Sequence, residues 1–497
     1  MMTMKTNSYK RGVSHFRKGL LAGTALIAAL TASAEGEHGV LDIYRNDNAF
    51  NHYRLADVEE ISYEQGSGGE YATMMVKDAK VKTAIALSAI DSCRVSATTL
   101  PDIYINLTDY PNIDDLFKGN GFTKSTIYQA TMRLDGNGTY DDIAEQTVEF
   151  RGRGNSTWRF AKTPYRFKMA KKAQVCGLPK AKTFALIANY IDPTHIRNTI
   201  AFWTARELGL PYTNHSVHCN VYLNGRYKGL YMMTEKIGIG GGSVDIDENT
   251  GMMFELDTNY DEDFQFRHDI GASKGLPVMV KDPDLTEIKP DPAEREAYWQ
   301  AWQADFGEMA DAVMAGGAIG DYIDLWETAR YVLVYNLACN REVNHPKSVN
   351  LFKEGLGSDY KYRFGPVWDF DWSTGFRAAD PTMNTYNRVL ASSDDSTPGA
   401  PFMRALVSNK AFMEAYREAW AEFKSEVYPR LMEYIDGYAA EIEPSAKRDG
   451  VLWPDAWANN EAWAQSSFDT AKHIGNLKTW LANRVKWLDN HARLGLY

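Results

Sequence analysis

The sequence predicts an α+β fold, in which a β-rich N-terminal half is followed by a mostly helical C-terminal half. Short alternating runs of apolar and polar residues, bounded by Gly, Asn and Asp, recur up to about residue 245. From about Pro292 to Tyr497 the apolar residues follow helical spacing, with many Trp and Ala. We therefore expect a small β module at 35–98, a β-rich region at 99–245 and a larger, mostly helical region at 246–497 that includes strands at 252–257 and 276–284.

The first 34 residues have the features of a secretory signal peptide. A basic segment without acidic residues precedes the apolar run GLLAGTALIAAL at 19–30, and Ala32-Ser33-Ala34 fits a cleavage site. The run is too short for a stable membrane anchor, and no later run is long and apolar enough to cross a bilayer. We expect an exported protein of the periplasm, cell surface or extracellular medium, with no transmembrane segment after cleavage.

Charge and cysteine content restrict the partners of the exported chain. Loss of the five basic residues in segment 1–34 takes the formal net charge from −11 to about −16, and such a chain repels nucleic acid and anionic lipid. Cys93, Cys176, Cys219 and Cys339 lack the spacing of a zinc site. Whether they form disulfides or remain buried thiols is left open by the sequence.

The β module contains a weak internal repeat. Residues 41–63 align with residues 73–95 at an offset of 32, so that Leu55 matches Leu87. Each copy consists of two short strand-like runs around a turn. We expect a structural or adhesive unit with a two-unit repeat, similar to leader segments of many exported Bacteroidetes proteins.

A glycine-rich loop is expected within VEFRGRGNSTW at 148–158. Gly152 and Gly154, on either side of Arg153, allow the backbone to approach a ligand closely, and amide groups there can hold phosphate oxygens. The following PYRFKM segment alternates apolar and basic residues, so one face of this strand carries Arg166 and Lys168. Lys168 is the preferred candidate for a phosphate-binding cation, with Lys162 and Arg166 as alternatives.

Two further elements follow the loop. YIDPTHIRNTIAFWTARELG at 190–209 predicts a helix with Asp192 as N-cap, which could supply Arg197 or Glu207 to orient neighbouring groups. HCNVYLNGRYKGLYMMTEK at 218–236 predicts a β-hairpin with its turn at Asn224-Gly225.

The strongest chemical signal is GPVWDFDWSTG at 365–375, which places Asp369 and Asp371 two residues apart. On an extended segment both would lie on one face, with Trp368, Phe370 and Trp372 on the other. Two adjacent carboxylates against an apolar surface attract a proton or a divalent cation. Oxygen ligands indicate Mg²⁺ or Mn²⁺, with Ca²⁺ a weaker candidate.

Six motifs together resemble the CotH-type atypical kinases, a family named after a spore-coat protein, in the form of an exported Bacteroidetes member. They are RGRGNSTW (151–158), KTPYRFKM (162–169), YIDPTHIRNTIAF (190–202), YLNGRYKGLYMMTEKI (222–237), NREVNHPKS (340–348) and GPVWDFDWSTG (365–375). The resemblance covers roughly 100–480 and implies a two-lobed, protein-kinase-like fold with an N-lobe at 99–245 and a C-lobe at 246–497. It also implies transfer of phosphate from ATP to a Ser/Thr hydroxyl of a protein.

The resemblance also suggests roles for single residues. Glu235 would lie near the hinge and touch adenine or ribose, and Asn350 would join Asp369 and Asp371 at the metal. In the spore-coat relatives an Asp of the upstream motif is the catalytic base, whereas the nearest acid here is Glu342. The longer side chain moves the carboxylate by more than an ångström, a misplacement that can cost roughly a hundredfold in rate.

Three functions are therefore weighed. The first is an exported, ATP- and metal-dependent protein kinase with Glu342 as catalytic residue. The second is a scaffold of the same fold that binds envelope or glycan partners without transferring phosphate. The third, a carbohydrate-active enzyme using Asp369 and Asp371, fits less well because glycosidase carboxylates act from opposite sides of a bond.

Overall fold

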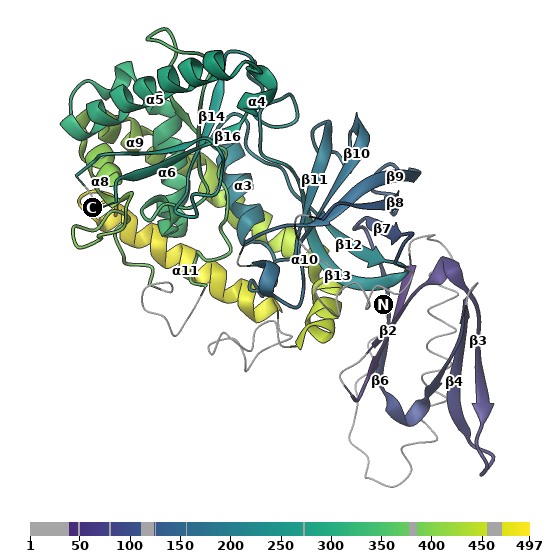
Figure 1. Ribbon diagram of the computed structural model, residues 1–497. Coiled ribbons are helices and arrows are strands. Elements are labelled where there is room, and N and C mark those ends of the chain that lie inside the picture. Colours follow the sequence, from purple (N-terminus) through teal and green to yellow (C-terminus); the bar gives the residue numbers. More distant parts are fainter. Residues whose placement is uncertain are drawn as a thin grey trace.

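The computed structural model has an α+β fold, as expected from the sequence (Figure 1). It describes residues 39–497 except 48–49, 79–80, 111–123, 125, 156, 272–273, 377–384 and 455–469. The expected signal peptide therefore lies outside the described residues. Three parts follow one another along the chain: a pair of small sheets, a β-barrel, and a larger region of helices around a five-stranded sheet.

The N-terminal part consists of two antiparallel three-stranded sheets, formed by the two similar segments. The first segment contains β1 (Gly39–Arg45), β2 (Phe50–Arg54), the 3-10 helix η2 (Leu55–Asp57) and β3 (Val58–Gln65); the second contains β4 (Tyr71–Asp78), β5 (Lys82–Ala86), η3 (Leu87–Ala89) and β6 (Ile90–Ala97). The sheet orders are β2-β1-β6 and β3-β4-β5. Each segment thus contributes its last strand to the other segment's sheet, which ties the two halves into one core.

A closed barrel of seven strands follows, whereas the sequence suggested only a β-rich region. Its order is β10-β11-β13-β12-β7-β8-β9, and the β9–β10 pair closes it. The strands are β7 (Asp102–Leu107), β8 (Tyr128–Asp135), β9 (Ile143–Gly152), β10 (Tyr165–Ala173), β11 (Ala181–Ile187), β12 (Val217–Leu223) and β13 (Arg226–Glu235). Apolar side chains at alternate positions fill the interior. The predicted hairpin is present, and Asn224 and Gly225 have the positive φ angles of its turn.

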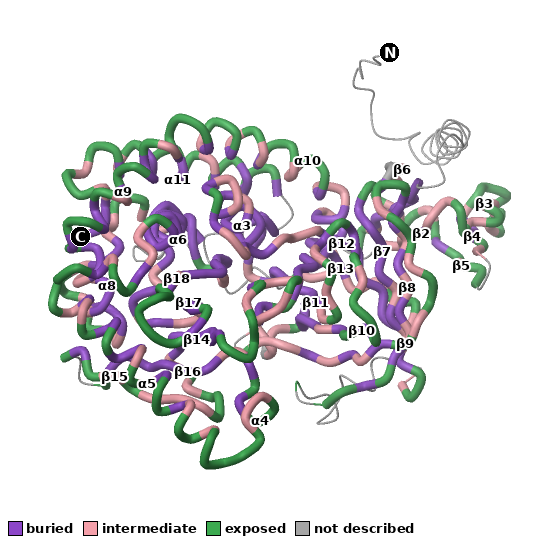
Figure 2. The backbone as a smooth tube through the Cα atoms, turned by 90° about the horizontal axis from the view of Figure 1, so that it is seen from above, coloured by how far each residue is buried: buried purple, intermediate pink, exposed green. Residues whose placement is uncertain are grey.

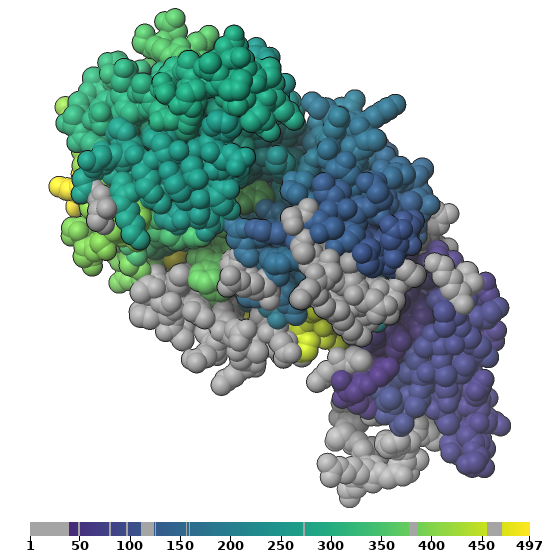
Figure 3. Space-filling model, in the orientation of Figure 1, coloured from purple at the N-terminus to yellow at the C-terminus, as the bar shows by residue number. Residues whose placement is uncertain are grey.

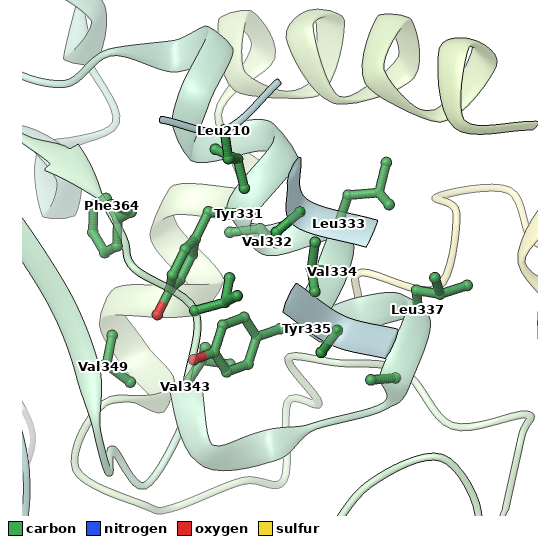
Figure 4. Close-up of a cluster of buried hydrophobic side chains, with 14 of the residues drawn as sticks. Leu210, Tyr331, Val332, Leu333, Val334, Tyr335, Leu337, Val343, Val349 and Phe364 are labelled. Carbon is green, nitrogen blue, oxygen red and sulfur yellow. The ribbon is translucent and has the colours of Figure 1, made fainter. Parts of the chain in front are cut away.

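The C-terminal part surrounds a sheet of order β15-β16-β14-β17-β18. Its strands are β14 (Met252–Leu256), β15 (Gln265–His268), β16 (Leu276–Asp282), β17 (Val349–Lys353) and β18 (Arg363–Phe364). Its helices are α4 (Leu285–Ile288), α5 (Pro292–Ala315), α6 (Leu325–Ala338), α8 (Ala400–Ser408), α9 (Lys410–Glu422), α10 (Tyr428–Leu452) and α11 (Thr470–Asn490). Helix α6 is almost entirely buried (Figure 2). Figure 4 shows Tyr331 and Tyr335 of this helix lying near Phe364 and Val343 in the core.

Helix α3 (Arg197–Glu207) lies between β11 and β12 in the sequence but packs into the C-terminal core. It begins five residues after Asp192, so the prediction of Asp192 as its N-cap was wrong. Asp192 instead closes the preceding turn, because Oδ1 accepts a hydrogen bond from the amide of Thr194 (2.9 Å) and Oδ2 accepts one from the amide of Arg197 (3.0 Å).

The N-terminal part is joined to the rest of the molecule by buried charges. Arg448 on α10 donates from Nη1 to Asp42 Oδ2 on β1 at 3.0 Å, and both side chains are at most 1% exposed. His52 on β2 contacts the other oxygen of Asp42 at 2.6 Å. The next residue of α10, Asp449, pairs with Lys162. One turn of α10 therefore contacts both the N-terminal sheets and the segment that leads into β10.

All four cysteines lie within the described ranges and carry free thiols. No helix among the described residues has the length and apolar character needed to cross a membrane.

Candidate functional site

A cleft of about 1140 Å³ lies where the barrel meets the C-terminal part (Figure 3). The barrel contributes the glycine-rich loop and the start of β10, and the C-terminal part contributes the ends of β14 and β17 and the loop after β18. Sequence segments that lie more than 200 residues apart therefore line one space. The charged residues that line it are Lys124, Arg151, Arg153, Arg166, Lys236, Glu255, Asp257, Asp261, Glu262, Lys281, Glu342, Lys347, Asp369 and Asp371, together with His345.

The barrel side of the cleft is basic. Arg151 and Arg166 are directly paired across strands β9 and β10, and Arg153 lies in the loop that joins these strands. Burial and the charges of Arg151 and Arg153 lower the pKa of Arg166 to about 10. Mutual repulsion of this kind in a partly desolvated place favours a bound polyanion. We call Arg151, Arg153 and Arg166 the arginine cluster.

The glycine-rich loop is shaped by close packing. Gly154 has a φ of +94°, and a Cβ atom on Gly152 would lie 1.9 Å from the ring of Trp158. The amide of Arg153 donates to the carbonyl of Pro164 at 3.1 Å, which holds the loop against the start of β10. Gly152, Arg153 and Gly154 all line the cleft, where the sequence suggested a ligand would lie.

Asp369 and Asp371 line the same cleft from the C-terminal side, and their charges oppose the lowering of the Arg153 pKa by burial. The expectation of an extended segment was wrong, because Asp369 has a φ of +66° and the chain turns at Asp371. Phe370 is buried in the core, Trp368 packs against the core while lining the cleft, and Trp372 is exposed and lines the cleft. The carboxylates nevertheless lie close enough to share a hydrogen bond. Burial, and then the charge of Asp369, hold the pKa of Asp371 well above its ordinary value.

Helix α3 holds this loop through consecutive residues. Asn198 Oδ1 accepts a hydrogen bond from the amide of Phe370 at 2.7 Å, and Arg197 Nε donates to the carbonyl of Ser373 at 3.0 Å. Of the two helix residues named from the sequence, Arg197 therefore orients the carboxylate loop. Glu207 instead pairs with Arg430 at the surface.

Glu342 and Asn350 also line the cleft. Glu342 lies in η6 (Arg341–Val343), whose start is capped by Asn340. Burial and the neighbouring charge of Asp369 raise the pKa of Glu342 to about 8. Asn350, on β17, donates from Nδ2 to the carbonyls of Ser348 and Pro366, each at 3.2 Å.

The oxygen atoms at this end of the cleft fit a hard divalent cation. Glu342 Oε2 and Asn350 Oδ1 are buried and have no hydrogen-bond partner among the described residues. Two close carboxylates and one amide oxygen match the partial protein coordination that Mg²⁺ shows when phosphates complete its shell. Within the described ranges, no three His, Cys, Asp or Glu side chains are grouped to hold a metal ion by themselves.

Three residues predicted to bind nucleotide lie elsewhere. Lys168 is 46% exposed and faces Glu149 at 3.4 Å, outside the cleft. Lys162 is fully buried and donates to Asp449 Oδ1 (2.7 Å) and the carbonyl of Leu230 (2.6 Å). Glu235 accepts hydrogen bonds from the amide and the ring of His215, at 2.8 and 3.0 Å. The geometry therefore does not support nucleotide contacts for these three, whereas Arg166 is placed for one.

The sequence reasoning missed several cleft residues. Arg151 could have been predicted, because it lies two residues before Arg153 in the same motif. Lys236 could also have been predicted, because it directly follows Glu235. Asn198 follows Arg197 in the motif already singled out. Asp257 had no such signal, because it reaches the cleft only through the pairing of β14 with β17.

A comparison with known protein families matches the part of the chain that contains the cleft residues. The family described as CotH kinase protein matches residues 150–488, which includes the arginine cluster, Glu342 and the Asp369–Asp371 loop. No curated protein matches the chain.

Proposed function

The chain belongs to the CotH kinase protein family, and from this premise we propose that it is an exported protein kinase, which uses a divalent cation to transfer the γ-phosphate of ATP to a Ser or Thr hydroxyl. The observation that carries the proposal is that the arginine cluster and the pair Asp369 and Asp371 line one cleft. In this proposal the barrel acts as the N-lobe and the C-terminal part as the C-lobe of a two-lobed kinase-like fold.

In this proposal the barrel side of the cleft binds phosphate and the C-terminal side binds the metal. The arginine cluster binds the phosphate oxygens and offsets their charge, and Gly152 and Gly154 let the loop backbone approach them closely. Asp369, Asp371 and Asn350 would hold Mg²⁺ or Mn²⁺, which when bound stabilises the charge of the transferring phosphate. Arg197 and Asn198 keep the carboxylate loop in place, so little reorganisation is required when phosphate binds.

Glu342 is the proposed catalytic base. It lies in the same cleft as Asp369, and a pKa near 8 suits proton abstraction close to neutral pH. Its carboxylate would receive the hydroxyl proton of the acceptor as the oxygen attacks the γ-phosphorus and ADP leaves. In phosphoryl transfer this group mainly positions the nucleophile.

Calorimetric titration tests the proposal directly. The chain without residues 1–34 should bind ATP in the presence of Mg²⁺ or Mn²⁺, and Asp369→Ala should weaken this binding at least about tenfold, because it removes a proposed metal ligand. Metal-free ATP should bind wild type and variant alike. If Asp369→Ala bound ATP with Mg²⁺ as tightly as wild type does, the metal assignment would fail.

A pair of substitutions on one strand tests the basic side. Arg166→Ala should weaken ATP binding about tenfold, since a charge-assisted hydrogen bond to phosphate is lost. Lys168→Ala, two positions along β10, should leave the affinity unchanged because its side chain lies outside the cleft. The reverse pattern in the same titration would return Lys168 to the phosphate site.

A scaffold that binds nucleotide without transferring phosphate is the second candidate. It is favoured by the N-terminal sheets, which are fixed to α10 by the buried Arg448–Asp42 pair and could present a partner next to the kinase-like region. Metal-dependent ATP binding without phosphate transfer or ATP hydrolysis would favour this candidate over the first.

A further inference from the structure

Asp257 lines the cleft directly after β14. It follows the last residue of β14, Leu256, which pairs with Val349 on β17. This register places Asp257 beside Ser348, and the carboxylate accepts a hydrogen bond from the Ser348 amide at 3.2 Å. The amide of Asn259 donates to its other oxygen at 2.6 Å. Both carboxylate oxygens are therefore fixed by backbone amides, while each keeps capacity to accept another hydrogen bond.

The segment after β14 is tied to the turn that carries Glu342. The amide of Thr258 donates to the carbonyl of Pro346 at 3.0 Å, and Lys347 Nζ donates to Asn259 Oδ1 at 2.7 Å. The amide of Lys347 in turn donates to the carbonyl of Glu342 at 2.9 Å, which closes the turn. Glu342 begins this closed turn, and Asp257 binds the amide of Ser348, the residue directly after it.

Asp257 belongs to the Glu342 end of the cleft. Its charge contributes to the raised pKa of Glu342, and its carboxylate binds the Ser348 amide, directly after the turn that Glu342 begins. The phosphate-binding arginines come from the opposite side, on the barrel. A buried, oriented carboxylate beside the proposed base is suited to bind a hydroxyl group.

We infer that Asp257 is an acceptor-binding residue: before transfer its carboxylate shares the single proton of the acceptor's Ser or Thr hydroxyl with Glu342 in a three-centre hydrogen bond, which orients the oxygen toward the γ-phosphate until Glu342 takes the proton. The inference rests on the proposed function. It assigns Asp257 no part in proton transfer and none in binding ATP or metal.

Asp257→Asn separates this role from a structural one. Asn also forms the turn in which a side-chain oxygen binds the amide two residues on, so the contact with the Asn259 amide is retained, while the charge and the contact with the Ser348 amide are lost. Asp247→Asn is the matched control, because Asp247 makes the same contact with the amide of Asn249 (2.9 Å) on an exposed loop outside the cleft. Should Asp257→Asn fail to fold, Asp257→Ser keeps an oxygen for the Asn259 amide.

The experiment compares three readouts in both variants, with dephosphorylated casein as acceptor. Asp257→Asn should lower kcat/KM for casein about 10- to 100-fold, as expected for losing a hydrogen bond to a charged group. Its KM for ATP, its calorimetric affinity for ATP with Mg²⁺ and its rate of ATP hydrolysis by water should match those of Asp247→Asn.

Two results would overturn the inference: an unchanged kcat/KM for casein in Asp257→Asn, or a loss confined to ATP affinity, which would make Asp257 a nucleotide or metal residue. A wild-type chain that binds no ATP, or that binds it without phosphorylating casein, would instead refute the proposed function, and the inference with it. The two failures are distinguishable because the second is seen without any substitution.

Discussion

Glu342→Gln should lower the rate of phosphate transfer by about two to four orders of magnitude while leaving ATP binding intact. General base catalysis contributes about 10²- to 10⁴-fold, and glutamine keeps the size and polarity of the side chain but cannot accept a proton. Glu342 lies in η6, outside the arginine cluster and outside the loop of Asp369 and Asp371. Transfer of ³²P from ATP, measured next to calorimetric affinity for ATP with Mg²⁺, separates the two effects.

The same variant has a defined pH signature. Burial and Asp369 raise the pKa of Glu342 to about 8, so the base is protonated at lower pH. The logarithm of kcat/KM should therefore rise with pH and level off above about 8, and Glu342→Gln should remove this dependence. Positive charge brought to Asp369 by a bound cation favours the carboxylate form of Glu342, so the midpoint should move to lower pH as Mg²⁺ is raised.

The raised pKa of Glu342 also makes the folded chain less stable at the higher pH at which the proposed base is ionised and active. Its pKa is raised from 4.5 in the folded state, so the folded chain binds more protons than the unfolded chain between pH 4.5 and 8. The stability due to this group is fully present below pH 4.5 and is lost as pH rises through 8.

An unchanged transfer rate and pH profile in Glu342→Gln would exclude Glu342 as the base and leave His345, which also lines the cleft, as the next candidate to test.

The sequence predicted the members of the carboxylate site better than its shape. The aromatic residues around Asp369 and Asp371 and the glycines near them indicated a shaped, partly buried pair, and the pair does line the cleft. The assumption of an extended backbone failed because the loop is held by Asn198 and Arg197 from a helix far back in the chain. No local pattern reports such a contact.

The two lysines predicted to bind phosphate lie outside the cleft for a related reason. Alternation along β10 correctly separates the interior of the barrel from its outside, but only the end of the strand near the glycine loop faces the cleft. Residues two apart on a strand are separated by about 6.6 Å, which is enough to take Lys168 away from a site that Arg166 reaches. Lys162 is neutralised by Asp449 from α10, a partner that the sequence around Lys162 cannot reveal.

The sequence also did not predict that the strands close into a barrel. The sequence marks the individual strands, and the adjacent pairs β12–β13 and β10–β11 follow from short connections. The barrel also requires β7 to pair in parallel with the distant β12. That pairing is set by the packing of the barrel interior rather than by turn residues.

Arg448→Ala should produce the largest loss of stability, about 3–5 kcal/mol, since removing one partner of a buried ion pair leaves the other charge uncompensated. The pair is Arg448 Nη1 with Asp42 Oδ2 at 3.0 Å, with both side chains at most 1% exposed. Burial alone would raise the pKa of Asp42, but the hydrogen bond with His52 and the charge of Arg448 outweigh it and lower the pKa. The stabilisation is therefore present at neutral pH and is lost as pH falls through the acidic range.

Denaturation by urea, with hydrogen exchange of the β1 and β2 amides, measures this effect. Arg430→Ala is the control, because its pair with Glu207 is 52% and 28% exposed and should contribute at most about 1 kcal/mol. Faster exchange confined to the N-terminal sheets in Arg448→Ala would show that the pair chiefly docks these sheets onto α10. Equal losses in the two variants would mean that the contact carries no more than a surface ion pair. If ATP affinity fell together with faster exchange, loss of the Arg448 contact would also disturb the strand that carries Arg166. The connection would run through Asp449 on α10 and its partner Lys162.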